Sequence, residues 1–120
     1  MPSVTPSSNV SPGVSGANTG NKMLLFQQTL MAALKNADPE ATIKISMTPP
    51  DPTHEENRSW RFEVSTKNGD GTDRNLPQNV RYIVDSIMRH SPYKGHSYSV
   101  CIDEDELSRM QIFISPNPGR

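Results

Sequence analysis

The chain has 120 residues, with twelve basic and thirteen acidic side chains and a formal net charge of −1. This length fits one domain, and the charge balance lacks the basic excess expected of a nucleic-acid-binding protein. One cysteine, Cys101, excludes an internal disulfide and a zinc site built on cysteines. No apolar run approaches the ~18 residues of a membrane helix.

The first 21 residues, MPSVTPSSNVSPGVSGANTGN, are rich in Ser, Pro, Gly and Asn and contain no charged side chain. Such a segment buries too little apolar surface to offset the entropy of ordering it. We therefore predict a disordered leader over residues 1–21 and one α+β domain over residues 22–120. The leader lacks the basic start and apolar middle of a secretory signal peptide, so we expect folding in the cytoplasm.

In composition this leader resembles the N-terminal leaders of bacterial type III secretion substrates. The resemblance implies export by a route other than the signal-peptide pathway. It also implies a role as a secreted effector, or in host or phage interaction. It covers residues 1–21 only, and it identifies no partner.

The segment NKMLLFQQTLMAALKNA, residues 21–37, predicts an amphipathic helix. Asn21 suits the N-cap, and Asp38-Pro39 ends the helix. The apolar stripe that faces the core is formed by Met23, Phe26, Leu30, Ala33, Leu34 and Ala37.

Three more apolar residues of this helix, Leu24, Leu25 and Met31, lie outside the stripe. We interpret them as a surface for a protein partner or for self-association, because apolar helix surface often marks such contacts and methionine adapts well to them. The alternative is that the sheet covers more of the helix than the stripe suggests.

Four segments alternate apolar and polar residues and predict strands with one buried face: ATIKISMT (41–48), SWRFEVST (59–66), HSYSVCID (96–103) and RMQIFIS (109–115). A second helix opens at Leu76-Pro77, because proline suits a first turn. Its apolar stripe is formed by Val80, Ile83, Val84 and Ile87. The predicted order is therefore helix, strand, strand, repeated once.

The two halves align with each other about 54 residues apart, with LKNADPEATIKISM against MRHSPYKGHSYSVCI. This predicts an internal αββ repeat and a four-stranded antiparallel or mixed sheet with two helices on one face. The order αββαββ is the ferredoxin-like order βαββαβ with its first strand moved to the end. In that permuted arrangement we expect strands 59–66 and 109–115 to be central and parallel to each other. Another strand order, or a sheet completed by a second chain, would use the same pattern.

The alternation also assigns each strand residue to a face of the sheet. We expect the helix-covered face to hold Ile43, Ile45, Trp60, Phe62, Val64, Val100, Ile102, Ile112 and Ile114. We expect the other face to show Thr42, Lys44, Ser46, Arg61, Glu63, Ser65, Ser97, Ser99, Cys101, Gln111 and Phe113.

This second face is either an ordinary solvated surface or a platform for a partner, with Arg61 and Phe113 as contacts. RNA-recognition sheets place two or three stacking aromatics on such a face, and here Phe113 stands alone. We therefore expect no nucleic-acid partner, and we keep a weak single-stranded nucleic-acid-binding sheet as an alternative.

The stretch RHSPYKGH, residues 89–96, raises the question of catalysis. Its proline ends the helix, and Lys94-Gly95 turns the chain into the next strand, whether or not chemistry takes place there. We therefore interpret the stretch as a structural connection. The alternative is a small enzyme with His90, Tyr93 and His96 at its site, acting across a dimer interface.

The run WRFEV, a helix and then RHSPYKGHSYSVCI is similar to the pterin carbinolamine dehydratases, which place paired histidines and a proline between a helix and a strand. Here His90-Ser91 replaces the histidine pair. The similarity therefore implies a shared topology without the chemistry, and we transfer none of the family's residues.

Acidic clusters give no metal site. NGDGTDRN (68–75) resembles a calcium loop but has Asp73 where the loop needs glycine and Asn79 where it needs glutamate. The acids of CIDEDEL fall at a predicted hairpin tip, which offers no burial. His54 with Glu55 and Glu56 could bind a metal only weakly.

We predict a small non-enzymatic protein-binding domain without cofactor or metal, with a protein partner or self-association and no membrane. The candidate partner-binding residues are Leu24, Leu25, Met31, Arg61 and Phe113.

Overall fold

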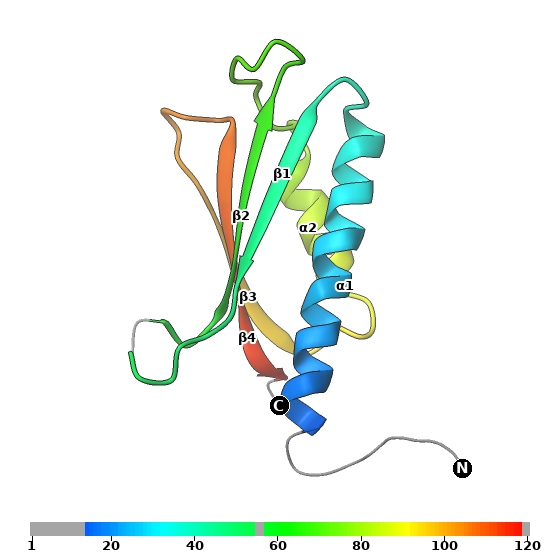
Figure 1. The fold of residues 1–120 in the computed structure, drawn as a ribbon. Coiled ribbons are helices and arrows are strands. Elements are labelled where there is room, and N and C mark those ends of the chain that lie inside the picture. Colours follow the sequence, from blue (N-terminus) through cyan, green and yellow to red (C-terminus); the bar gives the residue numbers. More distant parts are fainter. Residues whose placement is uncertain (1–13, 55–56, 119–120) are drawn as a thin grey trace, which may run out of the picture.

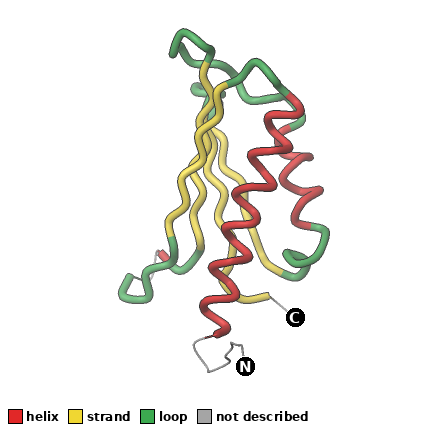
Figure 2. The backbone as a smooth tube through the Cα atoms, turned by 45° about the vertical axis from the view of Figure 1, so that its right-hand side comes forward, coloured by secondary structure: helices red, strands yellow, loops and turns green. Residues whose placement is uncertain are grey.

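The computed structural model describes residues 14–54 and 57–118 and has the predicted α+β class. The elements are α1 (Val14–Ala37), β1 (Thr42–Thr48), β2 (Trp60–Lys67), α2 (Val80–Met88), β3 (His96–Ile102) and β4 (Arg109–Pro118). Both helices lie on one face of the sheet, so the molecule has two layers (Figure 1; Figure 2). Within the described residues, neither helix combines the length and the apolar character that crossing a bilayer requires.

The four strands form one sheet in the order β1-β2-β4-β3, with every neighbouring pair antiparallel. The prediction that the second strand of each hairpin is central is confirmed. The prediction that β2 and β4 run parallel is wrong. Helix α2 carries the chain back to the end of the sheet where β2 began, so β3 runs in the direction of β2. Strand β4 then fits between them and is antiparallel to both. The internal repeat and the ferredoxin-like relation stay predictions.

The core lies between the sheet and the helices, and it uses the predicted alternation. Phe62 and Val64 of β2 and Ile112 and Ile114 of β4 are buried, as expected of the two central strands. The edge-strand residues that face the helices are mostly half-buried: Ile43, Met47, Tyr98, Val100 and Ile102. The polar residues between them lie on the opposite face of the sheet, as predicted.

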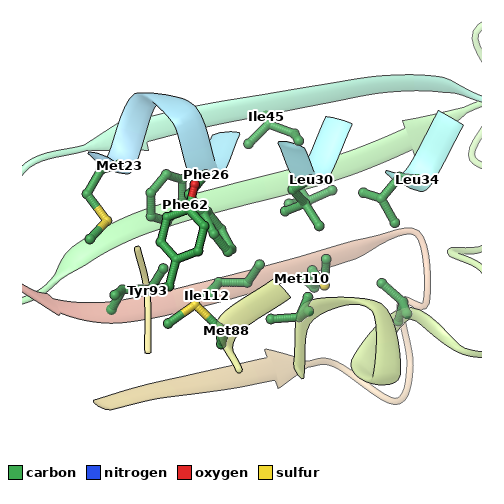
Figure 3. Close-up of a cluster of buried hydrophobic side chains, with 14 of the residues drawn as sticks. Met23, Phe26, Leu30, Leu34, Ile45, Phe62, Met88, Tyr93, Met110 and Ile112 are labelled. Carbon is green, nitrogen blue, oxygen red and sulfur yellow. The ribbon is translucent and has the colours of Figure 1, made fainter. Parts of the chain in front are cut away.

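An aromatic cluster occupies the centre of this core (Figure 3). The ring of Phe26 on α1 lies 4.9 Å from that of Phe62 and 5.5 Å from that of Tyr93, the second contact being edge to face. Met23, Leu30 and Leu34 extend the buried stripe of α1 on either side. The predicted stripe is therefore confirmed at four positions, whereas Ala33 is half-buried and Ala37 is exposed.

Helix α1 begins at Val14, seven residues before the Asn21 predicted as its N-cap. Asn21 is an exposed residue inside the helix, and the predicted boundary between leader and domain falls within α1. The reason is tertiary contact: the Thr19 hydroxyl donates to the carbonyl of Pro116 at the end of β4 (3.5 Å). Contacts of this kind extend a helix through residues of low helix propensity. The rest of the predicted leader, residues 1–13, lies outside the described residues.

An ion pair joins the end of α1 to the loop that precedes α2. Arg74 donates from Nε and Nη2 to the two carboxylate oxygens of Asp38, at 2.6 and 2.8 Å, and from Nη1 to the Asn68 side-chain oxygen at 2.8 Å. The hydrogen bond from Arg74 lowers the pKa of Asp38. This two-pronged contact closes the end of the molecule opposite the start of α1.

Candidate functional site

The segment between α2 and β3 forms a compact turn, as its structural interpretation predicts. The amide of Tyr93 donates to the carbonyl of His90 (2.9 Å), and the amide of His96 donates to the carbonyl of Tyr93 (3.0 Å). Gly95 adopts φ +97°, a left-handed conformation in which a glycine avoids the clash of a Cβ atom. The Ser91–Pro92 peptide bond is cis.

His96 is buried and both of its ring nitrogens have partners. Nδ1 lies 2.7 Å from the carbonyl oxygen of Ser115, and Nε2 lies 3.0 Å from the ammonium of Lys22. A carbonyl only accepts and an ammonium only donates, so these two contacts suit the tautomer that carries its hydrogen on Nδ1 and a lone pair on Nε2. In this arrangement His96 joins α1, β3 and β4.

His90 and Tyr93 lie in different surroundings from His96. His90 is exposed, and its Nδ1 bonds to the carbonyl of Ser86 one turn earlier in α2 (2.7 Å). Tyr93 is only 3% exposed, and burial raises the pKa of its hydroxyl. Of the three residues of the enzyme alternative, His90 thus lies at the solvent surface and Tyr93 lies in the aromatic core. His96 connects α1, β3 and β4 through its hydrogen bonds. Their backbones are joined by the hydrogen bonds of the turn, but their side chains lie in three different environments.

The acidic segments hold no metal cluster in the part of the chain that the structure describes. His54 bonds through Nδ1 to Asp51 (2.8 Å), whereas Glu55 and Glu56 lie outside the described residues. Asp70 accepts from the amide and the hydroxyl of Thr72, which stabilises its own turn and lowers the pKa of Asp70. These carboxylates act locally, in turns.

The face of the sheet opposite the helices carries the strongest candidate site. A groove of about 750 Å³ crosses all four strands towards the tip of the β3–β4 hairpin. Its polar lining includes Lys44, Ser46, Glu63, Ser65, Lys67, Cys101, Asp103, Glu106, Arg109 and Gln111. The volume is in the range of sites that hold small molecules or short stretches of peptide.

The charge of this face differs from that of the chain. Its strand residues include four cations, Lys44, Arg61, Lys67 and Arg109, and one carboxylate, Glu63. Two of the cations are neutralised at the rim, because Lys67 pairs with Asp73 (3.1 Å) and Arg109 pairs with Glu106 (3.2 Å).

The other two cations, Lys44 and Arg61, have no ion-pair partner among the described residues. The Nε atom of Arg61 is buried and no hydrogen bond from the described part of the chain reaches it. Arg61 lies directly opposite Phe113 in the β2–β4 register, so the two predicted contact residues of this face are neighbours. The sequence identified both residues, but it did not reveal the excess of positive charge around them.

No family model, curated protein or solved structure matches the chain. The similarity to the pterin carbinolamine dehydratases therefore has no family match to support it. Evidence for function has to come from the surfaces of the molecule itself.

The helix surface predicted from Leu24, Leu25 and Met31 is smaller than expected. Leu24 and Leu25 are 44% and 46% exposed, whereas Met31 packs against the core. Two neighbouring exposed leucines are common on soluble proteins, so this surface alone carries less weight than the groove.

Proposed function

We propose that this protein is a non-enzymatic binding domain that holds an acidic, extended segment of a protein partner on the open face of its sheet. The observation that carries the proposal is the charge of the strand residues on that face. They include four cations and one carboxylate, and two of the cations, Lys44 and Arg61, are not neutralised by the ion pairs at the rim. Lys44 is exposed in the groove and available for a carboxylate of the partner, and Arg61, whose Nε is buried, lies on the same face beside Phe113.

The choice of a protein partner follows from the rest of the face. Phe113 is its one aromatic residue, whereas sheets that bind single-stranded nucleic acid stack several bases on several aromatics. Serines at 46, 65 and 99 provide small hydrogen-bonding positions along which a peptide can lie.

The test uses two fluorescein-labelled probes, an oligo-glutamate peptide and an oligo-glutamine peptide of the same length, in fluorescence anisotropy titrations. We expect the acidic probe to bind, the neutral probe to bind more weakly, and the affinity for the acidic probe to fall as salt is added. Binding of neither probe would overturn the proposal. Stronger binding of a single-stranded RNA oligonucleotide would favour the nucleic-acid alternative instead.

Two variants with equal changes in net charge locate the binding surface. Lys44→Glu reverses a charge in the groove, and Lys94→Glu reverses an exposed charge in the turn after α2. We expect Lys44→Glu to weaken binding of the acidic probe about tenfold and Lys94→Glu to change it little. Equal losses would show attraction by net charge rather than a site. Replacing Leu24 and Leu25 by serine tests the helix surface in the same assay.

A further inference from the structure

The direction in which the backbone N–H and C=O groups of β3 point can be derived from one hydrogen bond between the two central strands of the sheet. The amide of Thr66 donates to the carbonyl of Ser108 across the β2–β4 pair (2.9 Å). Because bonded and non-bonded pairs alternate in antiparallel strands, Gln111 and Phe113 point their backbone groups towards β3. On β3 itself the alternate residues Tyr98, Val100 and Ile102 therefore point theirs away from the sheet.

The opposite edge, β1, is closed by α1. Gln27 donates to the carbonyl of Ile45 (2.7 Å), and Lys35 donates to the carbonyl of Ala41 (2.6 Å). Both bonds are partly buried, and β1 also carries the charge of Lys44. Helix cover and charge are two common means by which proteins block the pairing of an edge strand with another chain.

The β3 edge is much less protected. Two side chains of α2 contact it: Arg81 donates to the carbonyl of Val100 in an exposed bond of 3.2 Å, and Asp85 accepts from the Tyr98 hydroxyl. The strand, HSYSVCI, has no acidic or lysine or arginine side chain. Between α2 and β3 a groove of about 580 Å³ remains, lined by Arg81, Tyr82, Asp85, Tyr98, Ser99 and Val100. The register of β3 with β4 shifts between His96 and Tyr98, and the regular part, residues 98–102, is an uncharged template for strand pairing.

We propose that β3 pairs antiparallel with β3 of a second copy of this chain, with Val100 of both copies on the two-fold axis. In this register the exposed Arg81 bond to the Val100 carbonyl gives way, and each Val100 exchanges both backbone hydrogen bonds with its counterpart. Tyr98 then lies opposite Ile102. The half-buried apolar side chains of β3 gain cover, and no like charges meet across the two strands. The result is a continuous eight-stranded sheet.

A second copy fits this edge better than an unrelated peptide does, because β3 is complementary to itself. On one face it presents Tyr98, Val100 and Ile102, and on the other it presents Ser97, Ser99 and Cys101, which are small. The seam is short, so we expect a weak dimer that forms as concentration rises. This inference does not rest on the proposed acidic partner, because it is argued from the backbone edge of β3, although Ser99 and Cys101 beside the axis also belong to the open face.

Sedimentation velocity over a wide concentration range tests the dimer. The double variant Ser99→Lys, Cys101→Lys sets lysines of the two copies opposite each other, because residue 99 faces residue 101 in the proposed register. Its control, Ser46→Lys with Thr48→Lys, adds the same charge at exposed positions of β1. We expect a monomer from the first and a dimer from the second and from the wild type. A wild type that stays monomeric, or a β1 variant that also loses the dimer, would overturn the proposal.

Cysteine cross-linking tests the register. Residues 99 and 101 of the two copies form a non-hydrogen-bonded pair, whose Cα atoms lie about 4.5 Å apart, within disulfide reach. With oxidised glutathione to accept two electrons and two protons per disulfide, Ser99→Cys is expected to give covalent dimers with Cys101. The wild type and Ser97→Cys are expected to give few, because their cysteines are offset along the strands. Equal cross-linking in all three proteins would contradict the register.

Discussion

Gln27 of α1 and Arg81 of α2 make corresponding hydrogen bonds at opposite edges of the sheet. Gln27 donates to the carbonyl of Ile45 on β1 at 2.7 Å, and Arg81 donates to the carbonyl of Val100 on β3 at 3.2 Å. The two donors are 54 positions apart, which is the spacing of the predicted repeat. Each helix therefore guards the edge strand that follows it in the chain, but α1 does so more tightly.

This difference predicts unequal effects of removing the two donors. Gln27→Ala is expected to lower the free energy of unfolding by about 1 kcal/mol, because it leaves a partly buried carbonyl without its partner. Arg81→Ala should change it by less than about 0.5 kcal/mol, because the Arg81 bond is exposed and long. Urea denaturation followed by circular dichroism measures both, with the exposed Gln28→Ala as control. The opposite ranking of the two variants would contradict the assignment.

Two leucines of α1 separate core packing from surface exposure. Leu30 is fully buried, whereas Leu25 is 46% exposed. Leu30→Ala is expected to destabilise the protein by about 2–5 kcal/mol, because it leaves a cavity in a packed core. Leu25→Ala should change the free energy of unfolding by less than about 0.5 kcal/mol. Since the two substitutions are chemically identical, equal losses in urea denaturation would refute the assigned faces of α1.

Gly20 and Gly71 are expected to respond to alanine in opposite directions. Gly20 lies inside α1, and a Cβ atom there would make an ordinary contact with the Trp60 ring at 3.9 Å. Gly20→Ala should therefore stabilise the protein by about 0.5–1 kcal/mol. Gly71 has φ +89°, and Gly71→Ala should destabilise it by about 1 kcal/mol. Thermal unfolding of both variants checks the signs, and a Gly20→Ala protein that melts earlier than wild type would show that α1 does not continue through this position.

The ion pair of Asp38 with Arg74 makes part of the stability depend on pH. The hydrogen bond from Arg74 lowers the pKa of Asp38 from its usual 3.8, so the folded state favours the carboxylate. The stabilisation is complete above pH 3.8 and is lost as the pH falls through the folded pKa. We expect wild type to lose more stability than Asp38→Asn between about pH 6 and about pH 3, measured by urea denaturation. Parallel curves for the two proteins would be the contrary result.

His96 and His90 are expected to differ in reaction with diethyl pyrocarbonate. The Nε2 atom of His96 is bonded to Lys22 in a buried position, whereas His90 is exposed and bonded through Nδ1 alone. Mass spectrometry of peptides should show His90 modified early and His96 late. Lys22→Ala should speed modification of His96 without changing that of His90. If His96 reacts as fast as His90 in the wild type, the link between α1, β3 and β4 is not formed in solution.

Strand positions and core residues could be predicted from the sequence because each depends on local alternation. Alternate residues of a strand point to opposite faces, so Val64 and Ile112 are buried against the helices, whereas Glu63 and Gln111 lie on the open face. The start of α1 could not be predicted in this way, because VSGANTG has no apolar stripe and is held by the end of β4, far away in the chain.

The candidate sites depend on strand order, which alternation does not contain. Alternation already places Lys44 and Arg61 on one face, but only the pairing of β1 with β2 sets them on adjacent strands. Strand β3 likewise has a free edge because β4, and not β3, pairs with β2. Arg61 and Phe113 could be named in advance because they break the pattern of small polar residues on their face.

The contact between Thr19 and Pro116 brings the start of α1 next to the end of β4, as Figure 1 also shows. A linker between these two ends, with a cut at the exposed β3–β4 tip near Asp105, would give a circular permutant. Its chain would run β4-α1-β1-β2-α2-β3, a strand first and a strand last, with each pair of the sheet unchanged. The ribosome would then synthesise a central strand, β4, before either helix. The order in which the elements of the core become available for folding can therefore be changed without substituting a core residue.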